Sequence, residues 1–184
     1  MIPHAYSFVW DQVRFHIRAV ESCIDQLPSV PIVFDSNQIA QVPQTLRRSM
    51  VILVASCIES NLDALCHNLQ RKTGYPTHVE QEQGDGIERA AGYAKLVCGA
   101  EMKSFPHWSN VRVIQRARNV IAHANGVIPA TKTKNIASLR SAPNLALAKG
   151  ANPFRDTFVL EVHKGFAEWA TDEAAAFFDE VAKI

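Results

Sequence analysis

Three chemically capable side chains, Arg118, Asn119 and His123, lie close together in the segment RARNVIAHANG, residues 116–126. An imidazole titrates near neutral pH and can take or give a proton. A guanidinium can bind a phosphate through two hydrogen bonds and stabilise charge that develops on it, and an asparagine can orient either group. The set suits metal-free cleavage of RNA, in which the ribose 2′-hydroxyl attacks the adjacent phosphate. The alternative is that Arg118 is a surface residue and that His123 stabilises the C-terminal end of a helix.

Helical geometry limits how these residues can cooperate. Asn119 and His123 are four residues apart and share a helix face, whereas Arg118 and His123 are separated by about 140° around the axis. The guanidinium and the imidazole can converge if the long arginine side chain reaches round, if the helix is distorted, or if a second subunit completes the site. We therefore expect a homodimer, in which two such helices packed across a two-fold axis form a composite cleft.

The elements that must position these residues are expected to be helices. Apolar residues recur every three or four positions in five segments, which are 6–27, 44–72, 87–100, 110–124 and 165–183. Ser109 is the expected N-cap of the fourth helix, and Asn125-Gly126 is expected to end it in the left-handed conformation. The chain is thus predicted to be a single domain over residues 1–184, with an all-α fold, a bundle of about five helices.

The connections are predicted to be mostly irregular. Residues 28–43 contain Pro28, Pro31 and Pro43 and should be non-helical, with a short extended piece at 30–34. A polar loop is expected over 77–86, and a long, mobile basic loop over 127–156. The alternating pattern at 158–163 indicates a short strand or the lead-in to a helix.

Charge is distributed unevenly along the chain. The net charge is +1, yet residues 102–155 contain no Asp or Glu and nine Lys or Arg, so that this segment carries +9 and the remainder −8. Such asymmetry indicates a polyanion-binding face, unless the acidic remainder pairs with the basic segment in the fold. The candidate RNA-binding residues are Arg112, Arg116, Lys132, Lys134, Arg140 and Lys149.

Composition excludes several classes of protein. The 184 residues are 47% hydrophobic, as in a globular domain, and the longest apolar stretch, 50–58, is too short to span a membrane. No secretory signal is visible, so a cytoplasmic protein with no membrane partner is expected. No glycine-rich nucleotide motif and no metal-ligand spacing is present, so neither cofactor nor metal is expected. The four cysteines, Cys23, Cys57, Cys66 and Cys98, are expected to be reduced, buried thiols.

The Arg118-Asn119-x-x-x-His123 arrangement, followed at once by a helix stop, resembles the signature of the HEPN superfamily: an arginine, a polar residue, three to five residues, then a histidine. The context is similar too, because a long upstream helix with an embedded acid, Glu59, precedes the motif helix, and a helix rich in Phe and Trp ends the chain. This order resembles stand-alone, toxin-like HEPN proteins, of which the RiboL-PSP-type group is the most similar, and it covers most of the chain.

The resemblance implies an all-α homodimer and a metal-independent endoribonuclease that leaves a 2′,3′-cyclic phosphate and a 5′-hydroxyl. Arg118 would hold the phosphate, His123 would do acid/base work, and Asn119 would support them. Glu59 would orient Arg118 or His123, unless it is a solvated helix residue. A toxin or phage-defence role fits the family, with RNA and an antitoxin or acidic inhibitor protein as partners. HEPN toxins silenced by nucleotidyl transfer carry a tyrosine two residues after the histidine, and here that residue is Asn125.

Two other functions are compatible with the sequence. The chain could be a catalytically silent HEPN module that dimerises and binds RNA, nucleotide or a partner protein. It could also be a small helical interaction protein in which the motif is coincidental, and Arg118 and His123 would then lie far from any shared cleft.

Overall fold

The computed structural model describes residues 4–27, 36–84 and 86–184, which form six α-helices and a three-stranded sheet. The helices are α1 (His4–Gln26), α2 (Ser36–Thr73), α3 (Gly86–Cys98), α4 (Trp108–Ala124), α5 (Thr133–Arg140) and α6 (Phe166–Val181). The strands are β1 (Val127–Pro129), β2 (Leu145–Lys149) and β3 (Thr157–Val162), and two 3-10 helices cover Val79–Gln81 and Met102–Ser104.

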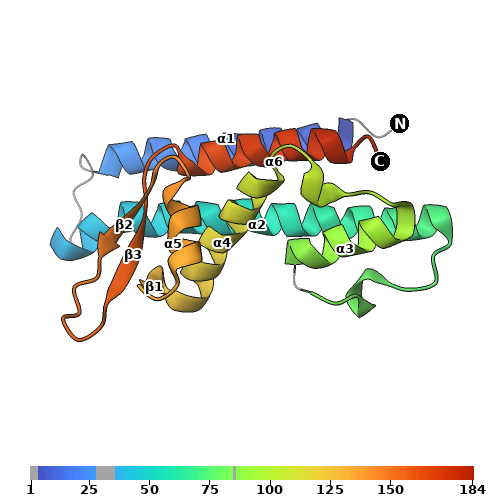
Figure 1. Cartoon of the computed structure of the whole chain (residues 1–184). Coiled ribbons are helices and arrows are strands. Elements are labelled where there is room, and N and C mark those ends of the chain that lie inside the picture. The colour runs from blue at the N-terminus through green and yellow to red at the C-terminus, as the bar shows by residue number, and fades with distance from the viewer. Residues whose placement is uncertain (1–3, 28–35, 85) are drawn as a thin grey trace.

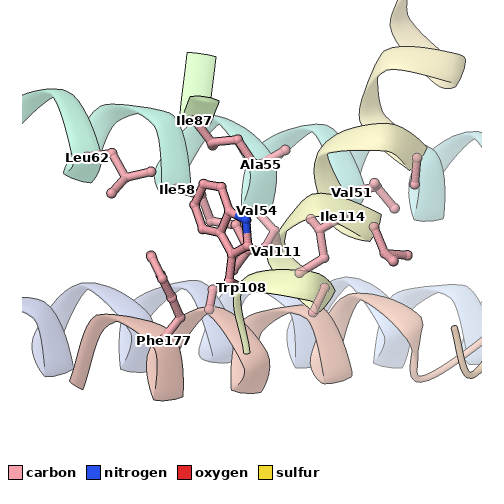
Figure 2. Packing of buried hydrophobic residues seen from close by; sticks show 14 of the residues in the cluster. Val51, Val54, Ala55, Ile58, Leu62, Ile87, Trp108, Val111, Ile114 and Phe177 are labelled. Atoms are coloured by element: carbon pink, nitrogen blue, oxygen red, sulfur yellow. The ribbon is translucent and has the colours of Figure 1, made fainter. Parts of the chain in front are cut away.

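The long helix α2 is the centre of the bundle. Helices α1 and α6 run side by side along one flank of it, α3 packs against its C-terminal half, and α4 crosses it (Figure 1). Figure 2 shows how α4 enters the core, because Trp108, Val111 and Ile114 lie between the apolar face of α2 and Phe177 of α6. The apolar stripe of α4 is therefore buried, which turns its polar residues outward.

Burial explains the composition of α2. Its residues Val51, Val54, Ala55, Ile58 and Leu62 are all fully buried in the core. By length and composition alone, residues Gln41–Thr73 could also cross a membrane. This is weak evidence, because the core helix of a soluble protein passes the same test. The stripe of α2 that faces α4 is apolar because it is packed against other helices.

The expectation of an all-α fold is correct for the bundle and incomplete for the remainder. Strand β3 lies between β1 and β2 and pairs with both in antiparallel fashion, with Val127 opposite Val159 and Leu147 opposite Leu160. The prediction that residues 127–156 form an irregular basic loop is wrong over most of that range, since the segment contains β1, α5 and β2. Pairing with β3, together with burial of Ile136 in α5, orders this segment.

Helix boundaries differ from expectation at two places. Helix α2 begins at Ser36 and continues through Pro43, although a proline inside a helix removes a backbone hydrogen bond and crowds the preceding turn. The N-cap of α4 is His107, with φ 67°, rather than Ser109, which lies inside the helix. The left-handed stop is confirmed, with φ 47° at Asn125 and 82° at Gly126. The extended piece expected at 30–34 lies outside the described residues.

The prediction that the cysteines are buried is wrong for three of the four. All four thiols are free, but Cys66 alone is buried; Cys57 is half-buried, and Cys23 and Cys98 are exposed. Burial raises the pKa of Cys66 to about 12. The exposed pair lies on helix faces that no neighbouring element covers.

Candidate functional site

One cleft of about 760 Å³ contains all four of the candidate catalytic residues. Its walls are residues 112–124 of α4, the start of α3, one residue of α2, strand β1 and the start of α5. Arg118, Asn119 and His123 come from α4, and Glu59 comes from α2. A coincidental motif would leave Arg118 and His123 far from a shared cleft, and the structure does not show that arrangement.

The turn after α4 fixes the end of the cleft. Arg48 of α2 donates from Nη2 to the carbonyl oxygen of Leu160 at 2.8 Å and from Nη1 to that of Asn125 at 3.3 Å. A Cβ on Gly126 would lie 2.6 Å from Nη2 of Arg48, at a φ of 82°. Glycine is therefore required here both by the backbone conformation and by the close approach of the arginine.

The guanidinium of Arg118 is held between two helices. Its Nη2 lies 3.7 Å from Oε2 of Glu59, and its Nη1 donates to Oδ1 of Asn119 at 2.8 Å. The Arg118 and Glu59 side chains are 26% and 25% exposed, so Glu59 faces the cleft rather than open solvent. Because Asn119 shares a helix face with His123, the hydrogen bond to Asn119 directs the guanidinium toward that face of α4.

Two residues of the site that the sequence did not indicate support Glu59. Gln115 donates from Nε2 to Oε1 of Glu59. Gly86, with φ 49°, leaves room for the carboxylate, since a Cβ there would lie 2.8 Å from Oε1. Gln115 precedes Arg118 by three residues on α4, a spacing that places them as neighbours, but only the approach of α2 and α3 gives either residue a role.

Polar atoms in the cleft wall are left without partners. In the described part of the chain, Nε of Arg118 and Oε1 of Gln115 are buried and have no hydrogen-bond partner. An unmade hydrogen bond of this kind costs about 1–3 kcal/mol. The wall of the cleft therefore contains one donor and one acceptor whose hydrogen bonds are not made in this arrangement of side chains.

His123 occupies the last turn of α4 and is exposed at the mouth of the cleft. No hydrogen bond to its ring is formed by the residues described, so neither tautomer is imposed on it. An exposed imidazole that lines a cleft can exchange protons with a bound hydroxyl and with solvent.

The predicted RNA-binding residues divide into two groups. Arg112, Arg116 and Lys132 line the cleft. Lys134, Arg140 and Lys149 lie outside it, and Arg140 instead places Cζ 5.2 Å from the ring centroid of Phe158. The structure thus brings half of the predicted cations to the catalytic candidates.

The cations in the cleft are unequally compensated. Arg112 places Nε 3.2 Å from Oε1 of Glu88, and Lys103 shares the same carboxylate at 2.7 Å. Arg116 and Lys132 have no carboxylate partner among the described residues. Burial, together with the nearby charge of Arg112, lowers the pKa of Arg116. The wall formed by α4 is therefore electropositive.

Within the described residues, no group of three or more His, Cys, Asp or Glu side chains could hold a metal ion. Comparison with protein-family models, with curated proteins and with solved structures finds no match to this chain. The interpretation of the cleft therefore depends on its own residues and on the motif that they carry.

Proposed function

We propose that this chain is a metal-independent endoribonuclease of the HEPN type, which cleaves RNA by attack of a ribose 2′-hydroxyl on the adjacent phosphate. The observation that supports it most is that Arg118, Asn119, His123 and Glu59 line one cleft. Proton transfer and stabilisation of phosphate charge are the two tasks of this reaction, and both can be done by side chains alone.

The proposed reaction uses each residue at a stated atom. The imidazole of His123 accepts the proton of the 2′-hydroxyl as O2′ bonds to phosphorus, and water gives a proton to the leaving O5′; in the reverse assignment His123 gives the proton to O5′ and water accepts the one from the 2′-hydroxyl. The P–O5′ bond breaks with its electron pair on O5′, which becomes a 5′-hydroxyl, and the other product is a 2′,3′-cyclic phosphate. Arg118 stabilises the charge on the non-bridging oxygens, and Glu59 and Asn119 hold its guanidinium in place beforehand.

We further propose that the active form is a homodimer. The exposed face of α2 carries Ser49, Leu53, Ser56 and Ser60, which recur every three or four residues, and Leu53 is 42% exposed. Ser56 and Glu59 are neighbours on the helix surface, so this face borders the cleft. A second copy seated there would bring two clefts close together, and light scattering should then give twice the chain mass of 20.4 kDa. A strictly monomeric particle at micromolar concentration would contradict the dimer.

A cytoplasmic toxin or phage-defence role would suit such an activity. The cations of the cleft that lack a carboxylate partner in the described residues would equally attract an acidic inhibitor protein. Co-purification with an acidic partner that blocks cleavage is the result expected of that role.

Cleavage of labelled RNA in the presence of EDTA tests the catalytic proposal. His123→Ala and Arg118→Ala should each lower the rate by about 10²–10⁴-fold. Undiminished cleavage in either variant would contradict the assignment. RNA binding without cleavage by the unaltered protein would instead favour the silent module that dimerises and binds RNA, nucleotide or a partner.

A further inference from the structure

A second, smaller cavity of about 270 Å³ lies beside the catalytic cleft, between α4 and α5. Its lining residues are Ser109, Asn110, Arg112, Val113, Arg116, Ser138 and Ser141. Arg112 and Arg116 line both spaces. The two cavities therefore meet at a pair of guanidinium groups.

The charge of Arg116 is not neutralised within the described part of the chain. Its side chain is half-buried, and no described carboxylate lies within 4.0 Å of it. Arg112 is four residues away on the same face of α4, and like charges at this spacing repel each other. The carboxylate that compensates Arg112 is shared with Lys103. An anion between the two arginines would relieve this repulsion.

The other polar groups of the cavity are neutral, and no carboxylate lines it. Ser141 donates from Oγ to the carbonyl oxygen of Ser138 at 2.7 Å, and Asn110 donates to Glu173 at 2.7 Å. The hydroxyls of Ser109 and Ser138 have no partner among the described residues. Guanidinium and hydroxyl donors together are the set that proteins use to bind phosphate.

The position of the cavity separates it from the chemistry. Residues 112, 116, 119 and 123 recur every three or four positions, so they follow one face of α4. Ser109, which lines only the smaller cavity, precedes His123 by 14 residues, which is about 21 Å along the helix axis. A group held by the hydroxyl of Ser109 is therefore too far from His123 to be the one cleaved, and it lies on the same helix as the catalytic candidates.

We propose that the cavity between α4 and α5 is a second phosphate subsite, which holds a non-scissile phosphate of the RNA against Arg116 and the hydroxyls of Ser109 and Ser138. The subsite rests on the proposed ribonuclease function for its substrate, and its role there is to fix the position of the strand. It also gives α5 a function, because this helix supplies the wall opposite the arginines.

Binding measured without cleavage tests the subsite separately from the catalytic proposal. A fluorescent, single-stranded 2′-O-methyl RNA lacks the nucleophile, so its affinity can be measured by anisotropy at several salt concentrations. Arg116→Gln should weaken binding about tenfold and flatten the slope of log K against log salt by about 0.7, the value of one lost contact to a single strand. Ser109→Ala with Ser138→Ala should weaken binding without changing the slope.

A matched control carries the same substitution elsewhere. Arg71 lies in the last turn of α2, is exposed and lines neither cavity, so Arg71→Gln should leave affinity and slope almost unchanged. The Arg116→Gln variant should also have a melting temperature equal to or above that of the unaltered protein, because the substitution removes a half-buried charge with no carboxylate partner in the described chain. A purely structural arginine would melt lower when replaced.

Oligonucleotides with and without a 5′-phosphate distinguish the two sources of the bound group. An Arg116→Gln effect of equal size on both identifies an internal phosphodiester, and an effect confined to the phosphorylated one identifies a terminal phosphate. Affinity and slope no different from those of Arg71→Gln would overturn the subsite and leave an acidic protein as the partner for this cavity. If the unaltered protein binds as described but does not cleave RNA, the subsite stands and the ribonuclease proposal fails.

Discussion

Cations on the two sides of the bundle are used in different ways. On the flank formed by α1 and α6, Arg14 pairs with Asp172 at 2.8 Å and Arg18 pairs with Glu168 at 2.6 Å. On the side formed by α4 and α5, Arg116 has no carboxylate partner in the described chain. The first arrangement aligns two helices, and the second leaves positive charge for a ligand.

The basic segment as a whole shows the same contrast. Of its nine cations, Lys103, Arg112 and Arg118 pair with described carboxylates, and the first two share Glu88. The other six are without such a partner in the part of the chain described, and they are Arg116, Lys132, Lys134, Arg140, Lys149 and Arg155. The acidic remainder of the chain therefore does not neutralise the basic segment there, and it is engaged largely with cations of its own.

Among substitutions that compare the charge pairs of the two sides, the largest effect is expected where the acid of the cleft is removed. Glu59→Gln abolishes the charge that holds Arg118 while it keeps the shape of the side chain. Cleavage should fall about 100-fold, since a misplaced guanidinium no longer stabilises the transition state. Steady-state rates on labelled RNA measure this change. The matched control is Glu168→Gln on the α1–α6 flank, and a loss of rate as large in the control would remove the distinction between the two sides.

A smaller effect, on stability rather than rate, is expected at the pair that joins α1 to α2. Glu21 accepts from Nε and Nη2 of Arg47, and the two side chains are only 12% and 17% exposed. Glu21→Gln should lower the free energy of unfolding by about 2 kcal/mol, because it leaves a mostly buried guanidinium without its counter-charge.

Urea unfolding measures that loss, and Arg18→Gln provides the comparison. The Arg18 side chain is 65% exposed, and an exposed pair contributes less than about 1 kcal/mol. Equal losses of unfolding free energy in the two variants would show that burial does not determine how much these ion pairs contribute to stability.

The smallest effect is expected among the lysines of α5 and its approach. Lys132 lines the cleft and Lys134 does not. Lys132→Gln should weaken RNA binding a few-fold and flatten its salt dependence, because one phosphate contact is lost. Lys134→Gln should do less, since only the long-range field changes. Equal effects of the two substitutions on the salt slope would mean that the RNA strand extends beyond the cleft and contacts Lys134 as well as Lys132.

Local signals in the sequence were sufficient to predict the motif helix and its end. The residues of α4 repeat with helical spacing, and Asn125-Gly126 carries the left-handed stop that its composition favours. Arg118, Asn119 and His123 could be chosen from their residue types and spacing on this helix, whereas Glu59 was indicated only by the resemblance to HEPN proteins.

Non-local contacts account for what the sequence did not indicate. Val127 pairs with Val159, far along the chain, and β1 has only three residues, so no local pattern marks it as a strand. Strand β2 contains two alanines, which have low strand propensity. The support that Gln115 and Gly86 give Glu59 arises only where α2, α3 and α4 meet.

The chemical identity of the cleaved ends tests the central claim most directly. RNA incubated with the purified protein in EDTA would be analysed by mass spectrometry, with His123→Ala treated in parallel. Attack by the 2′-hydroxyl predicts 2′,3′-cyclic phosphate and 5′-hydroxyl ends with the unaltered protein, and almost none with the variant. Ends that carry a 5′-phosphate and a 3′-hydroxyl, or the same products at the same yield from His123→Ala, would contradict a ribonuclease site at Arg118 and His123.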